Sequence, residues 1–441
     1  MVNWPVKLSS SSPEQLPTRK LISAWPPAAS LASLACIGRR CAVMEKAQIA
    51  GSGLSVNRRK EWASSMPLAL KVTSDPDAAL NYKKCSCLKL LSNCQNCVWG
   101  LYWRHPIHNS QLIFPEYRGN NMLKHGFELV EERKMPEVDG TARFWRHRKT
   151  GAQLLSVCNG DENKCFGVSF CTPPTDSTGI AHILEHSVLC GSKKYPVKEP
   201  FAELLKGSLQ TFLNAFTFPD KTCYPVASAN LRDFYNLIDV YLDAVFYPLL
   251  TEDTFRQEGW HVDAENVEDK PVFRGVVYNE MKGVYSSPDS VLAEQSQQAM
   301  FPDNLYSLDS GGNPEDIPNL TYQAFVDFHR RYYQPGNARF FFWGDDDEDA
   351  RLERLARELD KLESQEPPAP IPLQKPFAEQ RFLEVPYAAA EGRDKASFTL
   401  NWLLPERGDI ARAIKLDMLE HILEGLPGSP LRRALIESGL G

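Results

Sequence analysis

The sequence lacks any apolar run long enough to cross a bilayer. None of its hydrophobic stretches approaches the 18 or more residues that a transmembrane helix needs, and residues 25–38 hold too much Pro, Ala and Ser for a signal-peptide core. Eleven cysteines in 441 residues do not make a disulfide scaffold either. Cys85, Cys87, Cys94 and Cys97 are clustered, but their spacing matches no standard zinc module closely. We therefore expect a soluble protein without a membrane partner.

Acidic residues are scarce at the start of the chain. The first 60 residues hold nine Lys or Arg but only Glu14 and Glu45, a formal charge of +7, whereas the whole chain carries −7. A basic, Ser-containing, acid-poor start is typical of an organelle transit peptide, although a disordered tail would have the same composition. The acidic remainder argues against nucleic acid as a partner.

One stretch carries the strongest signal for chemistry. Residues 181–187 read AHILEHS, in which His182, Glu185 and His186 form His-x-x-Glu-His, the inverted zinc peptidase signature. Because residues three and four apart share a helix face, both imidazoles can hold one Zn²⁺ per chain while Glu185 reaches a water on the open coordination position. Glu185 would then act as the general base for attack on a peptide carbonyl. The competing interpretation is an amphipathic helix with histidines at its surface.

Two histidines and a water leave zinc one protein ligand short, so the fold must bring in a distal carboxylate. Glu280 lies 94 residues past His186 on an apolar-rich stretch with helical spacing, where a carboxylate needs a counter-ion to offset desolvation. Glu258 lies 72 residues past His186, beside Gly259, and suits a loop or helix end better. We favour Glu280 as the third ligand and keep Glu258 as the alternative.

Composition and periodicity divide the chain into four parts. Residues 1–121 have no sustained period and form a basic leader followed by a poorly defined segment; 122–345 mix strands and helices as an α+β catalytic domain; 346–377 form a charged helix and a Pro-rich linker; and 378–441 begin a second, truncated domain of the same kind. In that last part Met418, Leu419, Glu420 and His421 repeat the ILEH of residues 183–186, with Asp417 at the first-ligand position.

Periodicity and turn residues also predict the individual elements. Helices are expected over 201–213, 229–246, from 272 past Pro288 with a kink, 322–333, 350–364 and 409–424, and strands over 142–147, 153–157, 166–170, 222–226, 338–343, 382–385 and 397–404.

Several short motifs together resemble the presequence protease branch of the pitrilysin-type metallopeptidases. The resemblance covers about residues 125–441, and it is carried by residues 182–192 (HILEHSVLCGS), 213–217 (LNAFT), 224–225 (YP), 257–260 (QEGW), 279–283 (NEMKG) and 310–312 (SGG). It implies a pitrilysin-type (LuxS/processing-peptidase-like) fold, a mixed sheet packed with helices, and the ligand set His182, His186 and Glu280 with Glu185 as base. It also implies that Asn214, Ala215 and Phe216 lie on a strand whose edge binds extended substrate.

The resemblance further implies a chamber closed by two halves, of which this chain holds one domain and part of a second. Short unfolded peptides, such as cleaved organellar targeting presequences, would be the substrates, in a mitochondrion or chloroplast stroma. We therefore expect a zinc metalloendopeptidase that needs a complementary C-terminal half. The alternative is a catalytically weak, truncated homologue that binds peptides or pairs with a full-length relative.

Overall fold

The computed structural model describes residues 18–24, 122–198, 200–264, 266, 268, 270–388, 396–404 and 410–439. The chain divides into two compact units, with residues 18–24 and 122–404 of the described chain in the first and residues 410–439 in the second. The functional candidates all lie in the first unit.

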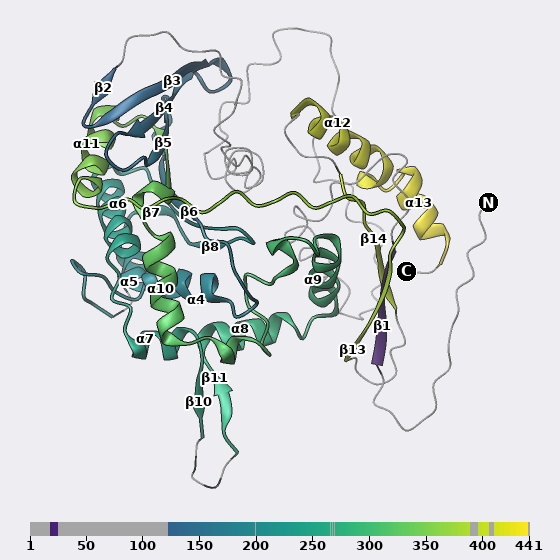
Figure 1. The fold of residues 1–441 in the computed structure, drawn as a ribbon. Helices are drawn as coiled ribbons and strands as arrows, with labels where there is room; N and C mark the ends of the chain where they lie inside the picture. The colour runs from purple at the N-terminus through teal and green to yellow at the C-terminus, as the bar shows by residue number, and fades with distance from the viewer. Residues whose placement is uncertain are drawn as a thin grey trace, which may run out of the picture. The chain divides into compact units, whose positions relative to one another are not determined.

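A nine-stranded mixed sheet forms the framework of the first unit (Figure 1). Its strands lie in the order β2-β3-β4-β5-β12-β6-β9-β7, with β8 also paired to β9. All neighbours are antiparallel except β12 and β5, which are parallel. The strands are β2 (Leu123–Lys124), β3 (Phe127–Met135), β4 (Gly140–His147), β5 (Gln153–Cys158), β6 (Lys164–Cys171), β7 (Gln210–Leu213), β8 (Phe216–Thr217), β9 (Lys221–Ser228) and β12 (Ala338–Gly344).

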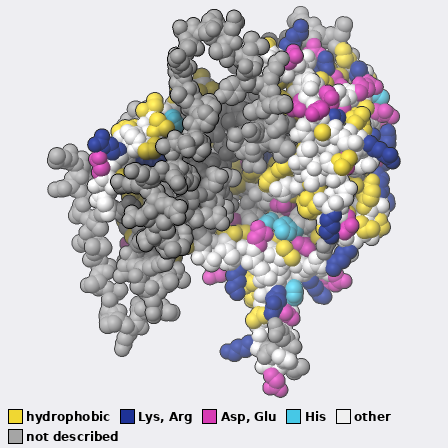
Figure 2. Space-filling view, turned by 180° about the vertical axis from the view of Figure 1, so that it is seen from behind, with side chains coloured by type: hydrophobic (Ala, Val, Ile, Leu, Met, Phe, Trp, Pro, Cys, Tyr) yellow, Lys and Arg dark blue, Asp and Glu magenta, His cyan; other side chains and the backbone are white. Residues whose placement is uncertain are grey.

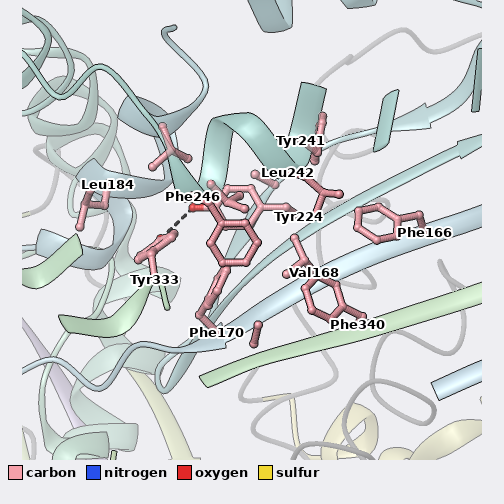
Figure 3. Close-up of a cluster of buried hydrophobic side chains, with 14 of the residues drawn as sticks. Phe166, Val168, Phe170, Leu184, Tyr224, Tyr241, Leu242, Phe246, Tyr333 and Phe340 are labelled. Carbon is pink, nitrogen blue, oxygen red and sulfur yellow. Dashed lines mark hydrogen bonds between the residues drawn. The ribbon is translucent and has the colours of Figure 1, made fainter. Parts of the chain in front are cut away.

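The central strands are buried on both faces, which explains why they read as almost continuous apolar runs. Figure 3 shows Phe166, Val168 and Phe170 of β6 beside Tyr224 of β9 in one hydrophobic cluster. Within that cluster the hydroxyl groups of Tyr224 and Tyr333 lie 2.7 Å apart, so two buried polar atoms satisfy each other.

Helices α4, α7 and α10 contact one another and lie together in Figure 1. The helices of this unit are α4 (Ile180–Val188), α5 (Pro200–Gly207), α6 (Leu231–Phe246), α7 (Glu252–Glu258), α8 (Val276–Val284), α9 (Pro288–Met300), α10 (Tyr322–Tyr332) and α11 (Glu348–Leu359). None of the helices in the described ranges is long and apolar enough to span a membrane.

Two of the expected helices differ from the structure. The helix expected over 201–213 ends at Gly207, because residues 210–213 instead pair with β9 as β7. The single kinked helix expected from 272 is three elements: β11 (Val272–Arg274), α8 and α9. Pro288 begins α9 after the N-cap Ser287, since proline is well suited to the first turn of a helix. The hairpin of β10 (His261–Asp263) with β11, and the helices α7 and α13, were not expected.

Regular structure also occurs before residue 122, where none was expected. Residues Thr18–Ala24 form β1, the middle strand of a second sheet between β13 (Phe382–Ala388) and β14 (Ser397–Leu400). A seven-residue strand is too short to give a recognisable period, and its partners lie more than 350 residues away in sequence. The cluster of Cys85, Cys87, Cys94 and Cys97 lies outside the described residues.

The second unit contributes α12 (Ile410–Glu420), a π-helical turn (His421–Gly425) and α13 (Pro430–Glu437). The sequence echo of the zinc motif falls across the junction of α12 and the π-helical turn, and Asp417 is exposed there.

Candidate metal centre

Helix α4 places both histidines of the motif on one face. Its other face is buried through Ile180, Ala181, Ile183, Leu184 and Val188, which anchor the helix in the core. His182 and His186 are one helical turn apart, and their ring centroids are 5.0 Å apart. The amphipathic pattern thus fixes the direction in which the two imidazoles point.

Helix α8 brings Glu280 to the same place. Its Oε2 atom lies 3.7 Å from Nε2 of His182 and 3.7 Å from Nε2 of His186. The three ligand atoms are all within 4.8 Å of one another, and we call this set the candidate metal centre. Close backbone packing positions α8: Gly275 has φ +151°, and a Cβ atom added there would lie 2.0 Å from the carbonyl oxygen of Gly259.

The other ring nitrogen of each histidine has its own acceptor. Nδ1 of His182 lies 2.9 Å from the carbonyl oxygen of Gly311 and donates to it, and Nδ1 of His186 lies 3.2 Å from Oε2 of Glu258. These contacts leave Nε2 of each ring unprotonated and directed toward Glu280, the arrangement that metal-binding histidines usually adopt.

The donor set fits a zinc ion. Two imidazole nitrogens and one carboxylate are a known catalytic zinc set, in which the fourth position stays open for water. Ligand atoms about 2 Å from one zinc lie about 3 to 4 Å from each other, and the 3.7 Å separations agree with that spacing. Figure 2 shows histidine and acidic side chains together on the surface, with hydrophobic side chains nearby.

The electrostatics couple His186 to Glu258. Burial by itself lowers the pKa of His186, but the hydrogen bond to Glu258 and the neighbouring carboxylates outweigh it, so the pKa is raised. Burial by itself raises the pKa of Glu258, but hydrogen bonds from His186 and Gln257 outweigh it, so the pKa is lowered. Glu258 therefore carries its charge beside the imidazole.

The reasoning that favoured Glu280 over Glu258 was wrong about burial. The side chain of Glu280 is 49% exposed, whereas that of Glu258, the last residue of α7, is 9% exposed. Glu258 is thus the buried carboxylate with a nearby counter-ion, and that counter-ion is His186. Its contact with the histidine was missed because only the fold brings α7 to α4.

Glu185, the expected general base, is held by a residue that the sequence did not single out. Thr217, on β8, donates a 2.6 Å hydrogen bond from Oγ1 to Oε2 of Glu185. This leaves Oε1 of the carboxylate for another proton donor. The only sequence signal for Thr217 was its place at the end of the LNAFT motif.

The expected substrate residues lie where the edge of the sheet is interrupted. Asn214 and Ala215 fall between β7 and β8, and Phe216 begins β8; Asn214 is exposed, Ala215 is buried and Phe216 is half-buried. Tyr241 donates a 3.2 Å hydrogen bond to the carbonyl oxygen of Asn214. Within the described ranges β7 is an end strand of its sheet.

Comparisons with known proteins place this region in a family. Residues 172–303 match the family described as "Insulinase (Peptidase family M16)", and residues 319–441 match "Peptidase M16 inactive domain". The two matches together cover more than half of the chain. The second match includes the echo of the zinc motif at residues 418–421.

Individual relatives agree with these matches. "Presequence protease 1, chloroplastic/mitochondrial" from Arabidopsis thaliana is 54% identical over 337 residues, which is 75% of this chain and 31% of that protein. "Protein HypA" from Clostridium perfringens is 47% identical over 331 residues, which is 74% of this chain and 34% of that protein. A crystal structure of pitrilysin aligns with a TM-score of 0.45 and 23% identity over 56% of this chain and 25% of that one.

The chain spans about a third of the length of the curated relatives it matches. The matches include the helix with both histidines and the helix with Glu280. The mixed sheet packed with helices has the α+β architecture that the motifs implied. The chain belongs to peptidase family M16.

Proposed function

We propose that this chain is the metal-binding part of a zinc metalloendopeptidase that degrades short unstructured peptides, such as cleaved organellar targeting presequences. The observation that carries the proposal is the convergence of His182, His186 and Glu280 beside Glu185. The relative from Arabidopsis supports the substrate class through its name.

The residues of the site suit hydrolysis of a peptide bond. A zinc ion held by His182, His186 and Glu280 would lower the pKa of a water molecule toward neutrality and polarise the scissile carbonyl. Glu185 would accept the proton of that water and pass it to the leaving amine. Thr217 restricts the rotation of the Glu185 carboxylate, which keeps one oxygen available for that transfer.

The sheet edge beside the site suits an extended substrate. Main-chain hydrogen bonds from an end strand bind a peptide with little regard for its side chains. Asn214, Ala215 and Phe216 adjoin Thr217, which contacts Glu185. A peptide paired along this edge would therefore pass close to the base.

We also propose that full activity needs a complementary C-terminal half, supplied by a longer relative or by a separate chain. The carboxylate of Glu280 is half exposed, so an isolated site would leave the developing oxyanion in contact with water. Loss of one oxyanion donor typically lowers kcat about 10² to 10³-fold. We expect the chain alone to bind zinc and to cleave peptides slowly.

A cleavage assay tests this function. The zinc-loaded chain is mixed with a flexible peptide of a few tens of residues, alone and with the C-terminal half of a full-length relative. We expect at least about 100-fold faster cleavage with that half, and no cleavage by Glu185→Gln, which keeps the shape of the side chain. Zinc binding and peptide binding without cleavage in either mixture would favour the alternative, a non-catalytic peptide-binding homologue.

We propose a mitochondrion or chloroplast stroma as the compartment. The basic first 60 residues and the name of the plant relative support it. Removal of those residues would also remove β1 from between β13 and β14. A reporter fused to residues 1–121 should enter one of these organelles, and a reporter that stays in the cytosol would contradict the proposal.

A further inference from the structure

Asp309 lies outside the metal centre but is connected to two of its ligands. The residue is only 7% exposed, and both of its carboxylate oxygens accept hydrogen bonds. Oδ1 accepts from the backbone N–H of Gly311 at 2.9 Å, and Oδ2 accepts from the hydroxyl of Tyr285 at 2.7 Å. A buried carboxylate with two donors is firmly held.

One side of this connection leads to His182. The carbonyl oxygen of Gly311 accepts the hydrogen bond from Nδ1 of His182. Gly311 has no room to shift, because a Cβ atom added there would lie 3.1 Å from Cε of Met281 and 3.2 Å from Oδ1 of Asp309. The orientation of the His182 ring therefore depends on the position of this one peptide group.

The other side leads to Glu280. Tyr285 is the C-cap residue of α8, five residues after Glu280 on the same helical path. Its hydroxyl bond to Asp309 ties the end of α8 to the loop that holds His182. The loop is also attached to the segment before α4, because the backbone N–H of Asp309 donates to Oγ of Ser177 at 3.1 Å.

We propose that Asp309 is a positioning residue that sets the distance between Glu280 and His182 by binding Tyr285 with one oxygen and Gly311 with the other. The inference rests on the proposed zinc site and adds a residue to its supporting structure. Without Asp309, two ligands from elements about 100 residues apart would share no side-chain link through this loop. Supporting contacts of metal ligands typically change metal affinity about 10 to 100-fold.

The test is zinc affinity, measured by competition with a chelator on the full chain. We expect Tyr285→Phe, which removes only the hydroxyl, to weaken zinc binding about 10-fold, and Asp309→Ala to weaken it up to about 100-fold. In the Asp309→Ala background, Tyr285→Phe should have no further effect, because the tyrosine acts through the carboxylate. The cobalt-substituted protein should show the same order in its visible absorption bands.

Tyr235→Phe is a matched control. Tyr235 donates a 3.3 Å hydrogen bond to Oδ2 of Asp346, another buried aspartate, on elements that contribute no ligand. We expect this variant to bind zinc within about twofold of the wild type, well below the change that a supporting contact causes. Equal zinc affinity for Tyr285→Phe and Tyr235→Phe would overturn the role of Asp309 alone. A wild-type chain that binds no zinc would overturn both this inference and the proposed function.

Discussion

Oε2 of Glu258 lies 3.2 Å from Nδ1 of His186, on the side of the ring that faces away from Glu280. The two glutamates therefore contact opposite nitrogens of one imidazole. Only the carboxylate beside Nε2 can share a metal with His182, whereas Glu258 orients the ring.

This difference separates the two carboxylates by experiment. Glu280→Gln removes a charged ligand and should weaken zinc binding by at least about 100-fold, while Glu258→Gln removes a supporting charge and should weaken it about 10-fold. Chelator competition at one pH measures both. A larger loss for Glu258→Gln than for Glu280→Gln would show that the assignment of the third ligand is wrong.

Thr217 should affect turnover without affecting the metal. Thr217→Val keeps the shape of the side chain but removes the donor to Glu185, so the base loses its orientation. We expect kcat to fall about 10-fold, a fraction of what general base catalysis contributes, with zinc content and KM unchanged. Thr217→Ser retains the hydroxyl and should restore most of the rate. Equal kcat for the valine variant and the wild type would remove Thr217 from the mechanism.

His329 should make the fold sensitive to acid. Burial lowers the pKa of His329 to about 4, although its Nε2 lies 2.8 Å from the carbonyl oxygen of Val245. Because the folded-state pKa lies below the unfolded value of 6.5, this stability is full above pH 6.5 and is lost as the pH falls toward 4. The loss should reach about 3 kcal/mol.

The variant His329→Gln isolates this contribution from that of other titrating groups. The free energy of unfolding, measured by denaturant titration between pH 7 and pH 4, should decline less steeply in the variant than in the wild type. Parallel pH profiles for the two proteins would contradict the prediction.

Arg351 should be essential for folding of the sheet. It is fully buried, forms a bidentate ion pair with Asp346, and donates to Oγ of Ser156 and to the carbonyl oxygens of Val157 and Gly344. Arg351→Met leaves Asp346 buried without its partner and should destabilise the protein by about 3 to 5 kcal/mol. The double variant Arg351→Met with Asp346→Asn should recover part of this. Denaturant unfolding measures both, and a cost below about 1 kcal/mol for the single variant would contradict the prediction.

The parts of the site that could be predicted from the sequence are local. His182, Glu185 and His186 are brought together by one helical turn, so their spacing alone indicates their shared face. The contacts of Glu258, Thr217 and Asp309 join elements far apart in the chain, and no local pattern encodes which side chains meet. Glu280 was recognised through its motif, while the burial argument for it did not hold.

The fold shows the same division. The strand Ala338–Gly344 and the helix Leu231–Phe246 have strong periodic patterns and were expected nearly at their observed limits. Residues 210–213 continue the apolar spacing of α5, yet pairing with β9 makes them a strand. The acidic run at residues 345–349 was expected on a solvated surface at a helix start. Asp347 does cap α11, but Asp346 is buried against Arg351.

Zinc content and peptide hydrolysis, measured together on four variants, test the central claim most directly. We expect one zinc per wild-type chain, none in His182→Ala or His186→Ala, a weakened site in Glu280→Gln, and full zinc content without hydrolysis in Glu185→Gln. The hydrolysis assay includes the complementary half so that the wild type turns over. Full zinc content in both histidine variants, or unchanged hydrolysis by Glu185→Gln, would contradict a zinc peptidase site at α4.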